Sequence, residues 1–117
     1  MAKPQPLKDA GIIITKPVGQ GDSLRERLET KGASVLHFPT LEILPVTQAS
    51  ELPRALEHLE RYHYAIFISP NAVDYAADFT DLASLPPKLK VAAIGPGTAR
   101  ALMARGRKPD MLPRDGA

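Results

Sequence analysis

The sequence of 117 residues contains no cysteine. This absence excludes a disulfide-stabilised scaffold, a thiolate nucleophile and any zinc or iron–sulfur site with cysteine ligands. It also fits a reducing compartment, and we expect a cytoplasmic protein. No apolar run approaches the length of a membrane span, so we expect a soluble chain with no membrane partner.

An excess of charge of one sign is also missing, since the net charge is only +2. Proteins dedicated to nucleic acids usually carry a concentrated basic face, so we expect no nucleic-acid partner. The N-terminus lacks the apolar segment of a signal peptide, and residues 1–10 are predicted to form a disordered lead. The apolar content of 44% suffices for a modest core.

Strand and helix patterns alternate along the chain. Short apolar or β-branched runs predict strands at residues 11–15, 35–38, 64–69 and 89–94, with a short last strand at 110–113. Helices are predicted to begin at Ser23, near Ser50, at Asn71 and at Thr98. Ser23 and Asn71 each have an acidic capping-box partner three residues later in the sequence. The alternation predicts an α/β fold with parallel sheets and right-handed crossovers.

Prolines divide this pattern into two parts. Pro39 and Pro45 flank a stretch that proline keeps out of a helix and out of a central strand. We expect residues 38–48 to form an extended linker between two flavodoxin-like lobes. Residues 11–37 would be one strand, helix and strand of the first lobe, and residues 49–117 most of the second. Both lobes are predicted to be incomplete. In the first, a strand–helix–strand unit cannot bury its own apolar faces, and in the second the chain stops at residues 114–117, where a further helix would be expected to begin.

The turns that follow three of the strands carry the candidate binding residues. In open α/β sheets ligands bind at the carboxyl ends of the strands, and helix N-termini there favour anions. The sequence therefore predicts a site for a small anion, with the residues of the second lobe at one edge of one sheet. The candidates are Thr15, Lys16, Gly19, Ser69, Asn71, Ala72, Gly95 and Thr98.

Structural roles for the same residues stay open. Ser69 and Asn71 also suit helix caps, Lys16 suits a solvated surface position, and the glycines around Pro96 suit a tight turn. Those glycines resemble the start of a dinucleotide fingerprint, but Arg100 stands where its third glycine would be.

No catalytic set stands out in the sequence. His37, His58 and His63 lack metal-ligand spacing, and there is no serine elbow and no phosphate loop. We expect no metal and name no catalytic residue. A flavodoxin-like or receiver-like module that binds phosphate or flavin is the alternative function, although a receiver would need an aspartate at a strand end.

Five motifs in colinear order resemble the uroporphyrinogen-III synthase family. They are Ile-x-x-Thr-Lys-Pro-x-Gly from Ile12, Leu-x-x-x-Gly-Ala from Leu28, Phe-Pro-x-Leu-x-Ile-x-Pro from Phe38, Ile-Phe-x-Ser-x-Asn-Ala-Val from Ile66 and Val-Ala-Ala-Ile-Gly-x-x-Thr-Ala from Val91. The family more often has arginine at the position of Lys16. The resemblance covers only the N-terminal half of the family's chains.

The resemblance implies a lyase of tetrapyrrole and haem biosynthesis that needs no cofactor. Its substrate, hydroxymethylbilane, is a linear tetrapyrrole with eight carboxylates, which loses water and closes to uroporphyrinogen III with inversion of the fourth ring. The C-terminal part of the family's chain completes the first lobe. The tyrosine usually proposed to help the hydroxyl leave lies beyond this chain, so we name no catalytic acid. The missing half should carry the rest of the first lobe and half of the cleft, and we therefore expect the chain by itself to be inactive.

A further expectation concerns assembly. The first strand and its helix are predicted to leave an apolar face exposed that includes Ile12, Ile14, Leu24 and Leu28. Such a face must be covered by a second copy or by the rest of a longer chain, or the segment would be disordered. Contact with another copy through the first strand is therefore one expected form of assembly.

Overall fold

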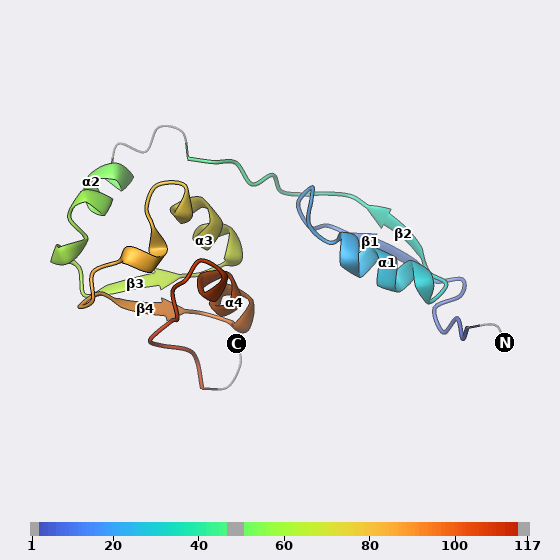
Figure 1. The fold of residues 1–117 in the computed structure, drawn as a ribbon. Helices are drawn as coiled ribbons and strands as arrows, with labels where there is room; N and C mark the ends of the chain where they lie inside the picture. The colour runs from blue at the N-terminus through green and yellow to red at the C-terminus, as the bar shows by residue number, and fades with distance from the viewer. Residues whose placement is uncertain (1–2, 47–50, 115–117) are drawn as a thin grey trace. The chain divides into compact units, whose positions relative to one another are not determined.

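The structure, a computed structural model, describes residues 3–46 and 51–114 of the chain. The chain divides into two compact units, Met1–Leu44 and Pro45–Ala117, and each is described by itself (Figure 1). The start of the predicted lead at residues 1–2, the end of the predicted linker at residues 47–48 and the helix start predicted near Ser50 lie outside the described residues.

The first unit is a two-stranded parallel sheet with one helix (Figure 1). β1 (Gly11–Ile14) pairs with β2 (Ser34–His37), and α1 (Asp22–Thr30) connects the two strands. Gly32, with φ of +98°, ends the connection, and its N–H donates to the Glu29 carbonyl at 2.9 Å. Glycine suits this position because other residues rarely adopt a positive φ.

The exposed apolar face of this unit matches the predicted one only in part, since Leu24 is exposed as expected. Ile14 is only 5% exposed, whereas Ile13 is 64% exposed, and Leu36 and Phe38 are exposed as well. Successive residues of a strand point to opposite faces, and the single helix covers only one of them. The prediction that Ile14 belongs to the exposed face is therefore wrong, and Ile13 takes its place.

The lead before β1 is attached to the first unit. The Leu7 N–H donates to the Lys31 carbonyl at 3.0 Å, and the Ser34 N–H donates to the Ala10 carbonyl at 2.9 Å. These bonds tie described residues of the predicted disordered lead, 1–10, to the end of α1 and the start of β2. Sequence patterns do not signal such bonds, because backbone groups of any residue type can form them.

Unit 2 is a second parallel sheet with two helices packed on it. β3 (Tyr64–Phe67) pairs with β4 (Lys90–Ala93), following α2 (Glu51–Glu57) and a 3₁₀ turn at Leu59–Arg61. The helices are α3 (Pro70–Ala77) and α4 (Pro96–Ala104), with a second 3₁₀ turn at Leu82–Ser84 between α3 and β4. Their contacts with the sheet form the core, which consists of Val73, Leu82, Val91, Ala93, Ala99 and Leu102.

The opposite face of this sheet is open. Tyr64, Ile66, Ile68 and Ile94 are all exposed, while the residues that alternate with them pack toward α3 and α4. The α/β fold with parallel sheets is thus confirmed, and each sheet has helices on one face only. Doubly wound sheets carry helices on both faces.

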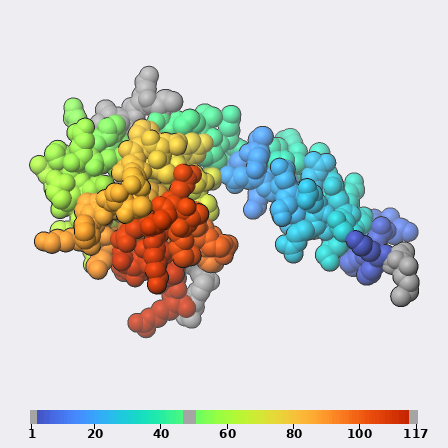
Figure 2. Space-filling view, viewed as in Figure 1, coloured from blue at the N-terminus to red at the C-terminus, as the bar shows by residue number. Residues whose placement is uncertain are grey.

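The predicted last strand is present as a single bridge. Met111 pairs in parallel with Ala92, and the Asp110 carboxylate accepts hydrogen bonds from the Val91 N–H at 2.8 Å and from Arg107 at 2.9 Å. The Val91 N–H, followed by the charge of Arg107, lowers the pKa of Asp110. In the space-filling view α4 and the segment after it, in deep orange and red, form the lower part of the visible face of unit 2 (Figure 2).

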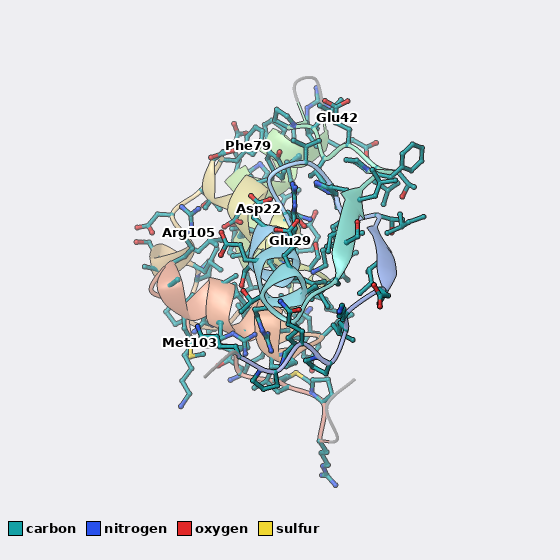
Figure 3. The ribbon with its side chains drawn as sticks, turned by 90° about the vertical axis from the view of Figure 1, so that its right-hand side faces the viewer. Asp22, Glu29, Glu42, Phe79, Met103 and Arg105 are labelled. Atoms are coloured by element: carbon teal, nitrogen blue, oxygen red, sulfur yellow. The ribbon has the colours of Figure 1, made fainter. Side chains whose placement is uncertain are left out.

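Both predicted capping boxes are wrong. Gly21, with φ of 90°, precedes α1 and no side chain caps that helix, so Ser23 lies inside its first turn. At α3 the cap is Ser69 and Pro70 is the first helical residue. Proline favours the first helical position, which shifts the cap to the residue before it and places Asn71 within the helix. Asp74, the other half of the predicted box, pairs at 3.2 Å with Arg105, which follows α4 and is labelled in Figure 3.

Candidate functional site

The carboxyl edge of the β3–β4 sheet brings five predicted site residues together. β3 and β4 are parallel neighbours, so the turns after Phe67 and Ala93 leave the sheet at the same edge. The two turns are joined where the Ile94 N–H donates to the Phe67 carbonyl at 3.2 Å. The residues at this edge are Ser69, Asn71, Ala72, Gly95 and Thr98.

Helix caps occupy some of these groups. The Ser69 hydroxyl oxygen accepts a hydrogen bond from the Ala72 N–H at 3.1 Å, so this N–H is occupied, whereas the Ser69 O–H can still donate to a ligand. Gly95 precedes α4 in an extended conformation, and its carbonyl accepts from the Ala99 N–H at 3.0 Å. Thr98 is only 4% exposed. Ser69 therefore caps α3, which is the structural role predicted for it as an alternative to ligand binding.

The first turn of α4 leaves backbone donors at this edge. Prolines 70 and 96 are the first residues of the two helices and have no N–H. The next N–H groups of α4, those of Gly97 and Thr98, have no carbonyl one helical turn earlier within their helix to which they could donate. Together with the helix dipoles, N–H groups in this position favour a negative charge.

The sequence interpretation missed one cation at this edge. A Cβ added to Gly97 would lie 3.8 Å from Nη2 of Arg100 and 3.8 Å from Cγ of Pro70. The Arg100 guanidinium therefore reaches back over the first turn of α4, beside the start of α3. Arg100 stands three residues after Gly97 in the sequence. This spacing could have indicated that the two residues lie side by side, because residues three apart are neighbours on a helix.

The remaining three candidates lie in unit 1. Thr15 and Lys16 follow β1 and are exposed, and Gly19 has φ of +78° in the loop that leads to α1. The last residue of β2 and a residue shortly after this strand hold the loop. His37 Nε2 donates to the Lys16 carbonyl at 2.8 Å, and the Thr40 N–H donates to the Thr15 carbonyl at 3.3 Å. The sequence interpretation did not link His37 or Thr40 to this loop.

The described residues offer anion-binding groups rather than reactive ones. Within residues 3–46 and 51–114 no three His, Asp or Glu side chains gather to hold a metal ion. The described helices include none that is long and apolar enough to cross a membrane. What unit 2 presents at the edge is backbone N–H groups and one guanidinium, which are groups that interact favourably with anions.

Comparison with known proteins identifies the family. Residues 22–117 match the family model of uroporphyrinogen-III synthase HemD. The chain belongs to this family. The resemblance predicted from the five motifs is therefore confirmed, and the turns described above are those of a HemD-family chain.

Individual HemD-family relatives are considerably longer. The chain is 32% identical over 114 residues to the uroporphyrinogen-III synthase of Synechococcus elongatus, covering 93% of this chain and 42% of that protein. It is 27% identical over 113 residues to the porphyrin biosynthesis protein HemD of Ruminiclostridium josui, covering 93% and 22%. The chain thus spans less than half the length of these relatives.

A solved structure matches a comparable share of this chain. The uroporphyrinogen III synthase of Thermus thermophilus superposes with a TM-score of 0.54 and 21% sequence identity, covering 92% of this chain and 46% of that one. This likeness supports the α/β fold of the HemD-family chain.

The Ser69 cap leads to a prediction about stability. We expect Ser69→Ala to lower the free energy of unfolding of unit 2 by about 1 kcal/mol, because the Ala72 N–H loses its acceptor. Ser23→Ala is the matched control, since Ser23 lies in the first turn of a helix that no side chain caps. Urea denaturation followed by circular dichroism measures both. An equal loss in the two variants would contradict the assignment of the cap.

Proposed function

We propose that this chain supplies the N-terminal part of a uroporphyrinogen-III synthase. The reaction is the cyclisation of hydroxymethylbilane to uroporphyrinogen III, with loss of water and inversion of the fourth ring. The observation that carries the proposal is the family match over residues 22–117, which contains the turns of the candidate site in unit 2. The enzyme would be a lyase that uses no cofactor.

The chemistry of the edge supports a substrate with many carboxylates. Helix N-termini and a guanidinium interact favourably with anions, and ring closure requires that a flexible linear molecule is held in one conformation. In the proposed enzyme Ser69, Asn71, Ala72, Gly95 and Thr98 contact the substrate from the second lobe. Thr15, Lys16 and Gly19 contact it from the first, and the catalytic acid belongs to the part of the family's chain outside this sequence.

The proposed domain organisation follows from the open sheet faces. We propose that residues 11–37 belong to a first lobe, residues 38–48 to a linker and residues 49–117 to a second lobe. The exposed residues Ile13, Leu36 and Ile66 would then pack against the remainder of a full-length family member. An open apolar face on each sheet supports this organisation, because such faces are normally covered.

The proposed setting is the cytoplasm, without a nucleic-acid partner. The substrate is a water-soluble octa-anion that does not cross membranes unaided, which supports a site of action where it is made. Cell fractionation with detection of the protein tests this location.

Self-association of the isolated chain is part of the proposal. We expect its weight-average mass to rise above 12.7 kDa with concentration, because the open face around Ile13 pairs with a second copy. Light scattering after size exclusion measures this. Ile13→Lys should lower the mass toward the monomer, and Val18→Lys, an exposed position in the loop after β1, should not. A monomer at all concentrations would contradict contact through β1.

The decisive experiment is a ring-closure assay with freshly prepared hydroxymethylbilane. It compares this chain alone with the same chain joined to the C-terminal remainder of the Synechococcus elongatus enzyme. Uroporphyrinogen III from the joined chain supports the proposal, and type I product alone from a folded joined chain would refute it.

A further inference from the structure

Two residues at and shortly after the end of β2 hold the loop that follows β1. The Thr15 carbonyl accepts hydrogen bonds at 3.3 Å from both the N–H and the hydroxyl of Thr40. The carbonyl of the next residue, Lys16, accepts a hydrogen bond from Nε2 of His37 at 2.8 Å. The path of the chain is therefore fixed at two successive peptide groups after it leaves the sheet.

The hydrogen bond to Lys16 depends on the residue type at position 37. Along the strands the donors are backbone groups, such as the Phe38 N–H, which donates to the Ile14 carbonyl at 2.8 Å and which any residue except proline would supply. At Lys16 the donor is instead the half-buried imidazole of His37. Because a carbonyl oxygen only accepts, Nε2 carries the proton, and a side chain without a donor at position 37 removes this bond.

The Lys16 side chain lies across Gly21, the residue that precedes α1. A Cβ added to Gly21 would be 3.4 Å from Cδ and 3.6 Å from Cβ of Lys16. Lys16 is exposed, and within residues 3–46 and 51–114 its ammonium group forms no ion pair. The hydrogen bond from His37 and the contact with Gly21 thus hold the backbone and the stem of Lys16, while its charge stays in solvent.

We propose that His37 is a positioning residue, which fixes the backbone of Lys16 and so the direction in which the lysine leaves the end of β1. This role rests on the proposed function, in which Lys16 contacts the substrate from the first lobe. His37 acts through Lys16 and does not itself touch the substrate. A lysine that is already ordered loses less conformational entropy when it binds an anion, so loss of the His37 bond weakens binding.

Amide hydrogen exchange of the isotope-labelled full chain tests the hold on the loop. The Gln20 N–H donates to the Pro17 carbonyl at 3.0 Å and reports on the loop, and the Phe38 N–H reports on the sheet. His37→Phe keeps a ring but removes the donor. It should raise the exchange rate of Gln20 about fivefold, as expected for the loss of one hydrogen bond, and leave that of Phe38 unchanged.

Two further variants separate the donor from the side chain as a whole. His37→Gln places an amide N–H the same number of bonds from Cβ as Nε2 of histidine, so it should restore the slow exchange of Gln20. His58→Phe changes a histidine of unit 2 that pairs with Glu60, and it should match the unaltered chain.

Each other outcome overturns the role of His37. The assignment is wrong if His37→Phe leaves the exchange of Gln20 unchanged, or if His37→Gln raises it as much as His37→Phe does. An equal rise at Phe38 would also overturn it, because His37 would then stabilise the whole sheet rather than the loop.

The joined enzyme separates this role from the proposed function. There His37→Phe should raise KM about fivefold and leave kcat nearly unchanged, and His37→Gln should restore KM. In a chain that already carries Lys16→Gln, His37→Phe should have no further effect, because it acts through Lys16. An unchanged KM, or independent effects of the two substitutions, would overturn the role of His37 while ring closure stands. Absence of ring closure in the unaltered joined chain would refute the proposed function, and the exchange rates would still decide whether His37 holds the loop.

Discussion

The chain alone is expected to form uroporphyrinogen III at least about a hundredfold more slowly than the same chain joined to the remainder of a longer family member. The reason is that ring closure requires the reacting groups of the substrate to be held in position. A displacement of about 1 Å in the geometry of a reacting group already costs roughly 10²-fold in rate. Less than half the length of the matched relatives is present here, and both sheets have an open face.

The measurement requires both product isomers to be resolved. Hydroxymethylbilane closes spontaneously to the type I isomer, so the rate of type III formation is compared with that background. Separation of the oxidised porphyrins by chromatography distinguishes the two isomers. The control is the joined chain with Arg105→Gln, which alters an exposed ion pair between α3 and α4 and should retain ring closure.

One outcome would contradict this expectation. Formation of the type III isomer by the chain alone, at the rate of the joined chain, would mean that the described residues contain the whole catalytic site. The inversion of the fourth ring would then have to be guided by the backbone donors of unit 2 or by the loop after β1.

Leu102→Ala is expected to have the largest effect on stability. Leu102 is fully buried in the core of unit 2, together with Val73 and Val91. Truncation of a buried leucine costs about 2–5 kcal/mol, since apolar contacts are lost and a cavity remains. This is a large part of the roughly 5–15 kcal/mol that stabilises a typical domain.

Met103→Ala is the matched control on the same helix. Met103 is 50% exposed and labelled on α4 in Figure 3, so its truncation should cost much less than that of Leu102. Urea denaturation followed by far-ultraviolet circular dichroism compares the two variants. Similar losses would show that α4 does not pack on β3 and β4 through Leu102.

The positions of the strands could be predicted because their signals are local. β-Branched runs such as the three isoleucines of β1 favour extended backbone, and the alternation of strands with helices requires parallel pairing. Gly32 and Gly106 follow the ends of α1 and α4, and both have a positive φ, which glycine adopts more readily than other residues. These features depend on the conformational preferences of single residues and their neighbours.

The helix starts show where one local signal, the capping box, led to a wrong prediction. Ser23 and Asn71 each have an acidic residue three positions on, yet Gly21 and Ser69 are the residues that precede the helices. At α3 a local preference, that of Pro70 for the first helical position, outweighed the capping box. The interpretation considered each motif alone and did not compare the competing signals.

The sequence by itself determined the strand segments, the parallel α/β class, the five family motifs and the turns that carry the candidate residues. The tertiary structure decided which face of β1 is covered, that Thr98 is buried and that Arg100 reaches back toward Gly97 and Pro70. The physical reason is the range of the interactions. Backbone preferences act over a few residues, whereas burial and the environment of a charge depend on elements that only folding brings together.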